Sequence, residues 1–419
     1  MLDTKFIREN LEAVQKAALN KNRKVEWDKL LDFDDRKKEL GKKIQELRTE
    51  RNELAGDRGQ GTGDREKGKK IKEELKKLEE EEREVNKELN RILLTVPNVP
   101  HPSVPVGKDE TGNVEVRKEG KIPHFDFTPL DHIELIKKLD LADLERGGKV
   151  GGFRAYFLKN EGALLEMAVL SYTFQKLAQK GYTPIIAPSL VKEFTLFGNG
   201  QFPWGREEVY HLEKDDVYLA GTAEVPVTAY YSGETLNEKD LPQKFVAFSP
   251  CFRREAGSYG KDTKGLYRLH QFNKVEQVII TTSDEENSLK FHEELQENSE
   301  SILKDLRLPY RVLLMCTGDM GEPQVKKYDI ETWMPGKNAY GETMSNSFMG
   351  DFQARRLNIR YKAKDGTTKF AHTLNNTAVA SPRILIAILE NYQQKDGSVV
   401  VPEVLRPFVG KEKIEVKQI

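Results

Sequence analysis

The sequence predicts an α+β protein in which an N-terminal antiparallel helical hairpin precedes a larger domain of strands and helices. Apolar residues recur at heptad spacing within residues 30–95, which is typical of a coiled coil. From about residue 108, short β-rich runs alternate with helical runs and carry the polar clusters. We therefore expect two domains, residues 1–107 and residues 108–419.

Two heptad seams flank a glycine-rich stretch in the first region. GDRGQGTGD, residues 56–64, contains four glycines, which are costly inside a helix. Two helices that fold back on each other as a coiled coil are the simplest solution, because each seam then faces the other. The seam residues are Phe33, Leu40, Ile44, Leu47 and Leu54, followed by Ile71, Leu75, Leu78, Val85, Leu89 and Ile92.

The charge of this hairpin indicates a partner. A solvated helical arm or a dimerisation coil would explain the periodicity alone. Residues 36–77, however, contain 15 Lys and Arg against 9 Asp and Glu. A basic rod is suited to lie along a phosphate backbone, which favours nucleic acid.

A proline-rich connector follows the hairpin. TVPNVPHPSVPVG, residues 95–107, contains four prolines. Such a segment favours an extended and stiff conformation, so we place the domain boundary there.

Composition excludes several classes of protein. The hydrophobic content is 37%, and no apolar run approaches the roughly 20 residues that a membrane-spanning helix needs. The N-terminal MLDTKFIREN lacks the plan of a secretory signal, so we expect a cytoplasmic protein. Only two cysteines, Cys251 and Cys316, are present, so neither a disulfide scaffold nor a zinc site is expected.

Residues 251–280, CFRREAGSYGKDTKGLYRLHQFNKVEQVII, carry charge where a buried strand would carry aliphatic residues. Side chains of like parity share one face of a strand, and two antiparallel strands here would present one surface of charge and one aromatic ring. Arginines on that surface suit phosphates, the ring suits a base, and carboxylates suit amines. The residues are Arg253, Glu255, Arg268, Phe272 and Glu276.

A plainer interpretation of this stretch is an exposed sheet face with cross-strand ion pairs. Five matched positions that include an aromatic residue make that interpretation the less favoured one. The connecting loop AGSYGKDTKG, residues 256–265, carries Lys261 and Lys264. It is equally compatible with a lid over a ligand, a contact to nucleic acid and a solvated turn.

FRRE, the loop and YRLHQF resemble motif 2 of the class II aminoacyl-tRNA synthetases. The whole chain is similar to the bacterial-type seryl-tRNA synthetases, in the order helical hairpin, proline linker and catalytic region. KGYTPIIAPSL is similar to motif 1, the dimer-forming element, and LAGTAEVP to the serine-binding loop. YGETMSNSFMGDFQARRLNIRY and AHTLNNTAVASPRILIAILENYQ occupy the places of a late ATP-binding strand and of motif 3.

The resemblance implies a catalytic domain built on a mainly antiparallel β-sheet flanked by helices. It implies activation of serine with ATP and Mg²⁺ to seryl-adenylate. It further implies transfer of the seryl group to the 3′ end of tRNA(Ser), with tRNA(Sec) as a second candidate acceptor. The implied partners are tRNA, contacted through the helical arm and the motif 2 loop, and a second copy of the chain in a homodimer.

The resemblance also implies roles for the residues of this chain that match the functional positions of the family motifs. Arg253 is implied to bridge the α-phosphate and the serine carboxylate, with Arg268 and Arg383 on the triphosphate. The remaining residues fall into three groups: Glu255 and Phe272 for adenine, Glu342 and Ser345 for Mg²⁺, and Thr222, Glu224, Glu276, Asn375 and Thr377 for serine. Independently of the family, Ser381 and Pro382 read as an N-cap and first helical residue, which places Arg383 in the opening turn of a helix.

The chain departs from the usual family pattern in two places. Met344, Asn346, Phe348 and Met349 stand where the late strand usually has Ser, Cys, Asn and Cys. Asn376, Ala378 and Pro382 stand where motif 3 usually has glycine. Glycine reaches backbone conformations that these residues avoid. We interpret the changes as a coordinated variant of the motif.

Two other functions compete with this interpretation. One is a paralogous enzyme that activates an amino acid and loads a carrier protein, but such enzymes typically lack the hairpin. The other is a non-catalytic RNA-binding protein, which would have no need of an adenylate pocket.

Overall fold

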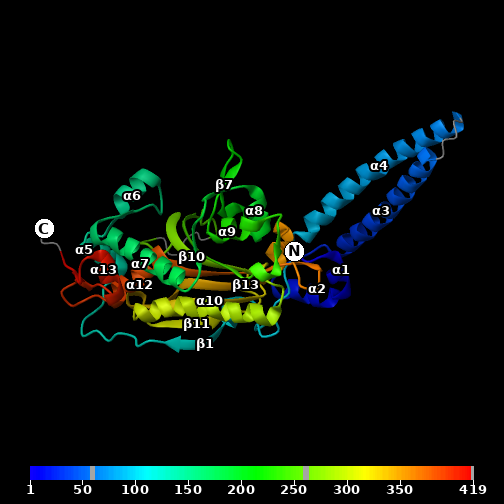
Figure 1. Cartoon of the computed structure of the whole chain (residues 1–419). Coiled ribbons are helices and arrows are strands. Elements are labelled where there is room, and N and C mark those ends of the chain that lie inside the picture. The colour runs from blue at the N-terminus through cyan, green and yellow to red at the C-terminus, as the bar shows by residue number, and fades with distance from the viewer. Residues whose placement is uncertain (57–61, 258–263, 417–419) are drawn as a thin grey trace. The chain divides into compact units, whose positions relative to one another are not determined.

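The computed structural model describes residues 1–56, 62–257 and 264–416 and divides into two compact units, Met1–Pro97 and Asn98–Ile419 (Figure 1). Its helical first unit and its largely antiparallel second unit confirm the predicted α+β class. The predicted domain limits, 1–107 and 108–419, stay a prediction. Within the described ranges, none of the helices combines the length and apolar character that crossing a bilayer requires.

The first unit is a helical hairpin preceded by two short helices. Two cross-helix ion pairs, Arg36 with Glu81 and Glu50 with Lys67, join an early residue of one long helix to a late residue of the other. This order requires antiparallel helices, as Figure 1 shows for α3 and α4. The helices are α1 (Thr4–Glu9), α2 (Leu11–Asn20), α3 (Trp27–Gly56) and α4 (Thr62–Leu93).

The predicted heptad seams form the interface of this hairpin. Ile44 of α3 packs on Ile71 and Leu75 of α4, and all three side chains are buried. Leu40, Leu89 and Ile92 are also buried. Apolar burial along the seam therefore stabilises the hairpin, because the outer faces of both helices are charged.

The second unit is built on an eight-stranded sheet in the order β1-β11-β12-β13-β16-β10-β9-β4. All neighbours in this order are antiparallel except β4 and β9, which are parallel. Its strands are β1 (Val114–Glu119), β4 (Thr183–Ile186), β9 (Gln243–Phe252), β10 (Gln271–Thr281), β11 (Tyr310–Leu314), β12 (Lys326–Met334), β13 (Ala339–Gly350) and β16 (His372–Ala380).

Helices cover one face of this sheet and leave the opposite face of its centre for a cavity. Val275 and Ile279 of β10 belong to the main apolar core, with residues of α7, α10 and α12. Figure 1 shows the long helix α10 running beside the strands. The helices of the second unit, which lie on either side of the sheet, are α5 (His132–Lys138), α6 (Leu144–Gly151), α7 (Asn160–Gln179), α8 (Glu193–Asn199), α9 (Glu224–Thr228), α10 (Glu285–Asp305), α11 (Phe352–Leu357), α12 (Ser381–Asn391) and α13 (Arg406–Val409).

Four small sheets complete the described part of the second unit. They join β5 (Leu190–Val191), β7 (Val217–Leu219) and β6 (Tyr210–Leu212); β15 (Thr368–Phe370), β14 (Arg360–Lys362) and β8 (Thr235–Asn237); β2 (Ala142–Asp143) and β3 (Phe157–Leu158); and β17 (Val399–Val400) and β18 (Lys413–Ile414).

The end of the proline-rich connector packs into the second unit. The backbone N–H of Asn98 donates to the carbonyl of Glu322 at 2.8 Å, and its side-chain amide donates to the carbonyl of Met349 at 2.8 Å. The backbone N–H of Thr317 donates to the carbonyl of Pro105 at 2.9 Å. Residues 98–107 contain no helix or strand, so these bonds fix an irregular segment.

Two central strands each contain a β-bulge. In β13, Met344 pairs with Ile330 and Glu342 pairs with Glu331, which leaves Thr343 as an extra residue. In β16, Val379 pairs with Val275 and Thr377 pairs with Glu276, which leaves Ala378 as an extra residue. A bulge reverses the alternation of side chains. In each strand, the residues that face the cavity therefore have odd numbers on one side of the bulge and even numbers on the other.

Candidate active site

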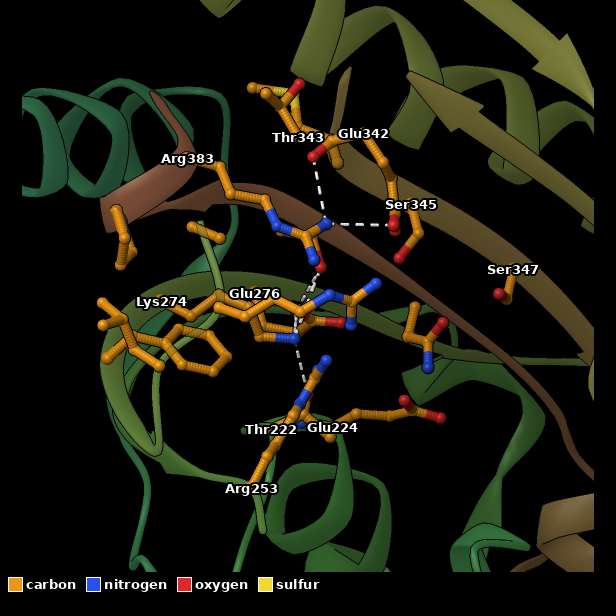
Figure 2. A pocket seen from close by; sticks show the side chains of 18 of the residues that line it. Thr222, Glu224, Arg253, Lys274, Glu276, Glu342, Thr343, Ser345, Ser347 and Arg383 are labelled. Carbon is orange, nitrogen blue, oxygen red and sulfur yellow. Dashed lines mark hydrogen bonds and ion pairs between the residues drawn. The ribbon is translucent and has the colours of Figure 1, made fainter. Parts of the chain in front are cut away.

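A cavity of about 290 Å³ opens on the free face of the central strands. All twelve site residues expected from the sequence line it, and Figure 2 shows several of them, including Glu224, Arg253 and Arg383, around one space. They come from the loop before α9 and the first residue of that helix, from β10, β13 and β16, from the segment between β9 and β10, and from the start of α12. They are Thr222, Glu224, Arg253, Glu255, Arg268, Phe272, Glu276, Glu342, Ser345, Asn375, Thr377 and Arg383.

One expectation about this surface is wrong. Arg253, Glu255 and Arg268 were expected on the strands themselves, but β9 ends at Phe252 and β10 begins at Gln271. The segment between them does not alternate as a strand does. His270 accordingly lines a neighbouring cavity, whereas Leu269 lines this one.

The loop predicted between these strands is only partly described. Lys264 is exposed, whereas Lys261 lies outside the described residues.

Arg253 is the most exposed of the three expected arginines, and its guanidinium lies 5.3 Å from the ring centre of Phe272. Its Nε donates to the carbonyl of Gly221 at 3.3 Å. Among the described residues it forms no ion pair with a carboxylate, so its charge is available to an anion.

Glu255 lies between two guanidinium groups. Arg268 donates to its Oε2 at 3.2 Å, and Nη1 of Arg154 lies 3.7 Å from the same oxygen. Glu255 and Arg154 both have left-handed backbones, with φ of 54° and 64°. Such strain in non-glycine residues is typical of functional sites.

Arg383 and Glu342 form a partly exposed ion pair across the cavity wall. Nη1 of Arg383 donates to Oε2 of Glu342 at 2.9 Å and to its carbonyl at 3.0 Å, as Figure 2 shows. Burial alone would raise the pKa of Glu342, but the charges of Arg383 and Lys327 lower it to about 2. The carboxylate is therefore ionised at neutral pH.

Arg383 lies in the first turn of α12, as predicted, although the predicted cap is wrong. The N-cap is Ala380, Ser381 is the first helical residue, and Ala380 provides no side-chain cap. The hydroxyl of Ser381 instead accepts a hydrogen bond from the backbone of Asn273 at 3.4 Å. The helix begins one residue early because β16 runs directly into it.

The β13 bulge brings Glu342 and Ser345 to the same cavity. They are three positions apart, so a regular strand would point them to opposite faces. The extra residue Thr343 restores a common face. Next to them, Lys327 donates to Asp329 at 2.9 Å, and burial raises the pKa of Asp329 to about 7.

Glu224 begins α9 and points into the cavity with two amide partners. Nδ2 of Asn199 and Nε2 of Gln353 donate to its Oε1 at 2.8 and 2.9 Å. Burial raises the pKa of Glu224 to about 7, and the nearby charge of Glu276 adds to the rise. A cationic ligand would reverse this shift and be attracted by the carboxylate.

Lys274 and Glu276 form a buried ion pair at 2.5 Å. Nζ of Lys274 also donates to the hydroxyls of Thr222 at 2.6 Å and Thr377 at 3.3 Å. The hydroxyl of Thr377 donates to Glu276 at 3.2 Å. The pair compensates the charge of Glu276, which would otherwise be costly to bury.

Sequence analysis missed several residues of the cavity. Lys274 alternates along β10 with Phe272 and Glu276, so strand alternation could have predicted that it faces the cavity. Lys327 and Tyr267 also line the cavity, and Gln353 and Arg154 support its carboxylates from outside. Lys327, Gln353 and Arg154 had no local signal, because distant segments bring them to the site, whereas Tyr267 lies next to Arg268 in the stretch already singled out.

The replaced motif positions show no backbone strain. Within the described residues, none of them has a positive φ. Asn346 and Asn376 are paired neighbours on β13 and β16 and point away from the cavity into the interface with α10. The remaining replacements are Met344, Phe348, Met349 and Ala378, all buried in the strands, and Pro382, the second residue of α12.

Two family models match the chain. The model of the seryl-tRNA synthetase N-terminal domain matches residues 1–100, which include the hairpin. The model of the tRNA synthetase class II core domain (G, H, P, S and T) matches residues 208–392, which include most of the cavity.

Known proteins resemble the chain over its whole length. The serine–tRNA ligase of Deinococcus radiodurans is 49% identical over 419 residues, with 99% of each chain covered. That of Treponema denticola is 44% identical over 423 residues, with 99% of this chain and 100% of the relative covered.

A solved structure agrees. The crystal structure of seryl-tRNA synthetase from Pyrococcus horikoshii complexed with ATP superimposes with a TM-score of 0.94 at 39% identity and covers 100% of both chains. The fold, the cavity and these similarities lead to one assignment: the chain belongs to the seryl-tRNA synthetase family of class II aminoacyl-tRNA synthetases.

Proposed function

We propose that this cavity activates serine with ATP and that the chain then transfers the seryl group to the 3′ end of tRNA(Ser). The observation that carries the proposal is the cavity itself, where three arginines, an aromatic ring and separate carboxylates converge. The relatives named as serine–tRNA ligases and the ATP complex of the Pyrococcus horikoshii enzyme support the same substrates.

The first step joins serine to the α-phosphate. A serine carboxylate oxygen attacks the α-phosphorus, and the bond from that phosphorus to the bridging oxygen of the β-phosphate breaks. Pyrophosphate leaves with the electron pair. Arg253 contacts both reacting groups and stabilises the negative charge that develops between them, since no carboxylate of the described residues pairs with it.

The second step joins the seryl group to tRNA. A hydroxyl of the terminal ribose attacks the acyl carbon, the bond from that carbon to the adenylate oxygen breaks, and AMP leaves while the hydroxyl proton is released. Catalysis in both steps rests on positioning and charge rather than on a dedicated protein base.

ATP binds along the arginine side of the cavity. Phe272 stacks on adenine and Glu255 accepts its amino group, while Arg268 and Arg383 bind the triphosphate. Glu342 and Ser345 fit a magnesium ion, because an ionised carboxylate and a hydroxyl on one face are hard oxygen donors. A magnesium ion held there would neutralise phosphate charge.

Serine binds on the opposite side. Glu224, with Thr222, binds the ammonium group, and Glu276, Asn375 and Thr377 line the space for the hydroxyl. A site that hydrogen-bonds a hydroxyl rejects alanine strongly, because its polar groups would then lie unpaired. Threonine is rejected by shape.

Transfer RNA binds through the basic hairpin, with the motif 2 loop near its 3′ end, and tRNA(Sec) is a further possible substrate. A helical rod suits the shape and backbone of an A-form arm. Since aminoacylated tRNA is consumed by protein synthesis, we place the activity in the cytoplasm.

The proposed assembly is a homodimer. Exposed apolar residues lie on β4, within the segment that resembles motif 1, and on α7, the helix that precedes it: Ile186, Leu164 and Met167. An exposed apolar surface of this kind is typical of a protein interface.

The activity is tested by ATP–pyrophosphate exchange with the purified chain. We expect exchange with serine, and a kcat/KM lower by roughly 10⁴-fold or more with alanine. Equal exchange with alanine, or none with serine, would contradict the proposal. Aminoacylation of tRNA(Ser) then separates this enzyme from one that loads a carrier protein.

Replacing Arg253 with alanine should abolish adenylate formation and leave the fold intact. Loss of one group that stabilises the developing charge costs on the order of 10²- to 10³-fold in kcat, and Arg253 also binds both substrates. Arg254→Ala is the matched control, because Arg254 is exposed and does not line the cavity. Near-normal exchange in Arg253→Ala would refute the assigned role.

The affinity for serine should weaken as the pH falls. Glu224, with a pKa of about 7, must be ionised to attract the ammonium group. Between pH 8 and pH 6 its ionised fraction falls about tenfold, so the KM for serine should rise by a similar factor. Glu224→Gln should raise the KM and remove this pH dependence, whereas exposed Glu207→Gln should retain it. The same slope in Glu224→Gln would assign the titration to another group.

Shortening the hairpin should impair transfer of the seryl group to tRNA and leave adenylate formation unchanged. Deleting residues 48–54 and 64–70 removes one heptad from each helix and shortens the arm by about 10 Å. Exchange should be unchanged, because the cavity lies in the second unit, whereas the KM for tRNA(Ser) should rise. Unchanged charging would show that the arm tip does not contribute to tRNA binding.

A further inference from the structure

A buried polar layer lies between α10 and the sheet, on the face opposite the cavity. Oδ1 of Asn376 accepts hydrogen bonds from Ser299 at 2.6 Å and from Gln277 at 2.7 Å. Asn346 of the neighbouring strand donates to Gln296 at 3.2 Å and to the carbonyl of His292 at 2.8 Å. All these side chains are buried, so the polar contacts replace what would usually be apolar packing between helix and sheet.

Ser299 contacts the strand at the residue that reaches the cavity. Its hydroxyl lies 3.4 Å from the backbone carbonyl of Thr377 as well as 2.6 Å from the side chain of Asn376. Thr377 directly precedes the bulge at Ala378, and Asn376 lies one residue before Thr377. Ser299 therefore links a rigid helix to the place where β16 departs from regular pairing.

The bulge determines how Thr377 enters the cavity. Thr377 pairs with Glu276 on β10, and its hydroxyl donates to that carboxylate at 3.2 Å. A shift of the bulge by one residue would turn Thr377 to the opposite face. The polar layer thus fixes, from behind, the side chains that line the proposed serine pocket.

We propose that Ser299, acting with Asn376, is a positioning residue for serine recognition. The proposal rests on the proposed function, because it assigns Thr377 and Glu276 to the serine side chain. Neither Ser299 nor Asn376 touches the cavity. Their contribution is made through the position of the β16 backbone.

A contribution to the free energy of unfolding does not by itself explain the polar layer. Oδ1 of Asn346 and Nδ2 of Asn376 are buried and have no hydrogen-bond partner among the described residues. A partly satisfied polar layer stabilises less than an apolar one of the same shape. Fixing one strand register is the benefit that such a layer provides.

Kinetics of Ser299→Ala, Asn376→Ala and the double variant test the proposal. Each single variant should raise the KM for serine about tenfold and leave the KM for ATP within about twofold, since the ATP residues lie on other segments. The ratio of kcat/KM for serine over threonine should fall. Because both residues act through one contact, the double variant should be no worse than the poorer single variant.

Ser288→Ala is the matched control. Ser288 is also a buried serine of α10 that contacts β16, but it bonds to His372 at the far end of the strand, at 3.0 Å. It should lower the melting temperature without changing the KM for serine. Equal effects of Ser288→Ala and Ser299→Ala on that KM, additive effects in the double variant, or an unchanged KM would each overturn the proposal. If the wild-type chain lacks serine-dependent exchange, the proposed function fails first and the inference falls with it.

Discussion

The register of three neighbouring strands, β10, β13 and β16, decides which side chains reach the cavity. Without the extra residue at Thr343, Glu342 and Ser345 would lie on opposite faces of the sheet. Without the extra residue at Ala378, Thr377 and Ala380 could not both line the cavity, as they do. The chemistry of the site therefore depends on two local departures from regular pairing, each fixed by the packing around it.

Charge compensation is the second constraint on the cavity. Glu276 is paired with Lys274, Glu342 with Arg383 and Glu255 with Arg268, so the protein can gather these groups before any substrate binds. Arg253 differs, because it has an aromatic ring and a carbonyl as neighbours. The carboxylates that are proposed to bind substrates are therefore compensated by nearby cations. Among the described residues, the positive charge of Arg253 stays uncompensated at the place where the reaction develops negative charge.

Local patterns in the sequence predicted the hairpin and much of the cavity. The seam of Ile44, Ile71 and Leu75 follows from heptad spacing, because burial of that stripe is a local consequence of helical geometry. Phe272 and Glu276 follow from strand alternation. Arg253 and Arg268 were assigned correctly to the cavity but wrongly to strands, since alternation cannot reveal where a strand ends.

The remaining features depend on contacts between distant segments. Gln353 donates a hydrogen bond to Glu224, and Arg154 lies beside Glu255. In both cases more than a hundred positions of the chain separate the two residues. Neither bulge could be predicted from its own strand, because a bulge is a property of two paired strands.

The replaced motif positions show how the fold accommodates changes in sequence. Ala378 occupies the bulge, Pro382 lies in the first turn of α12, where the missing N–H is tolerated, and Asn376 directs its side chain away from the cavity. Asn376 and Ala378 face away from the cavity, whereas Met344 and Pro382 line it, and none of these four residues has a positive φ. The backbone of this chain therefore does not require the glycines that motif 3 usually has.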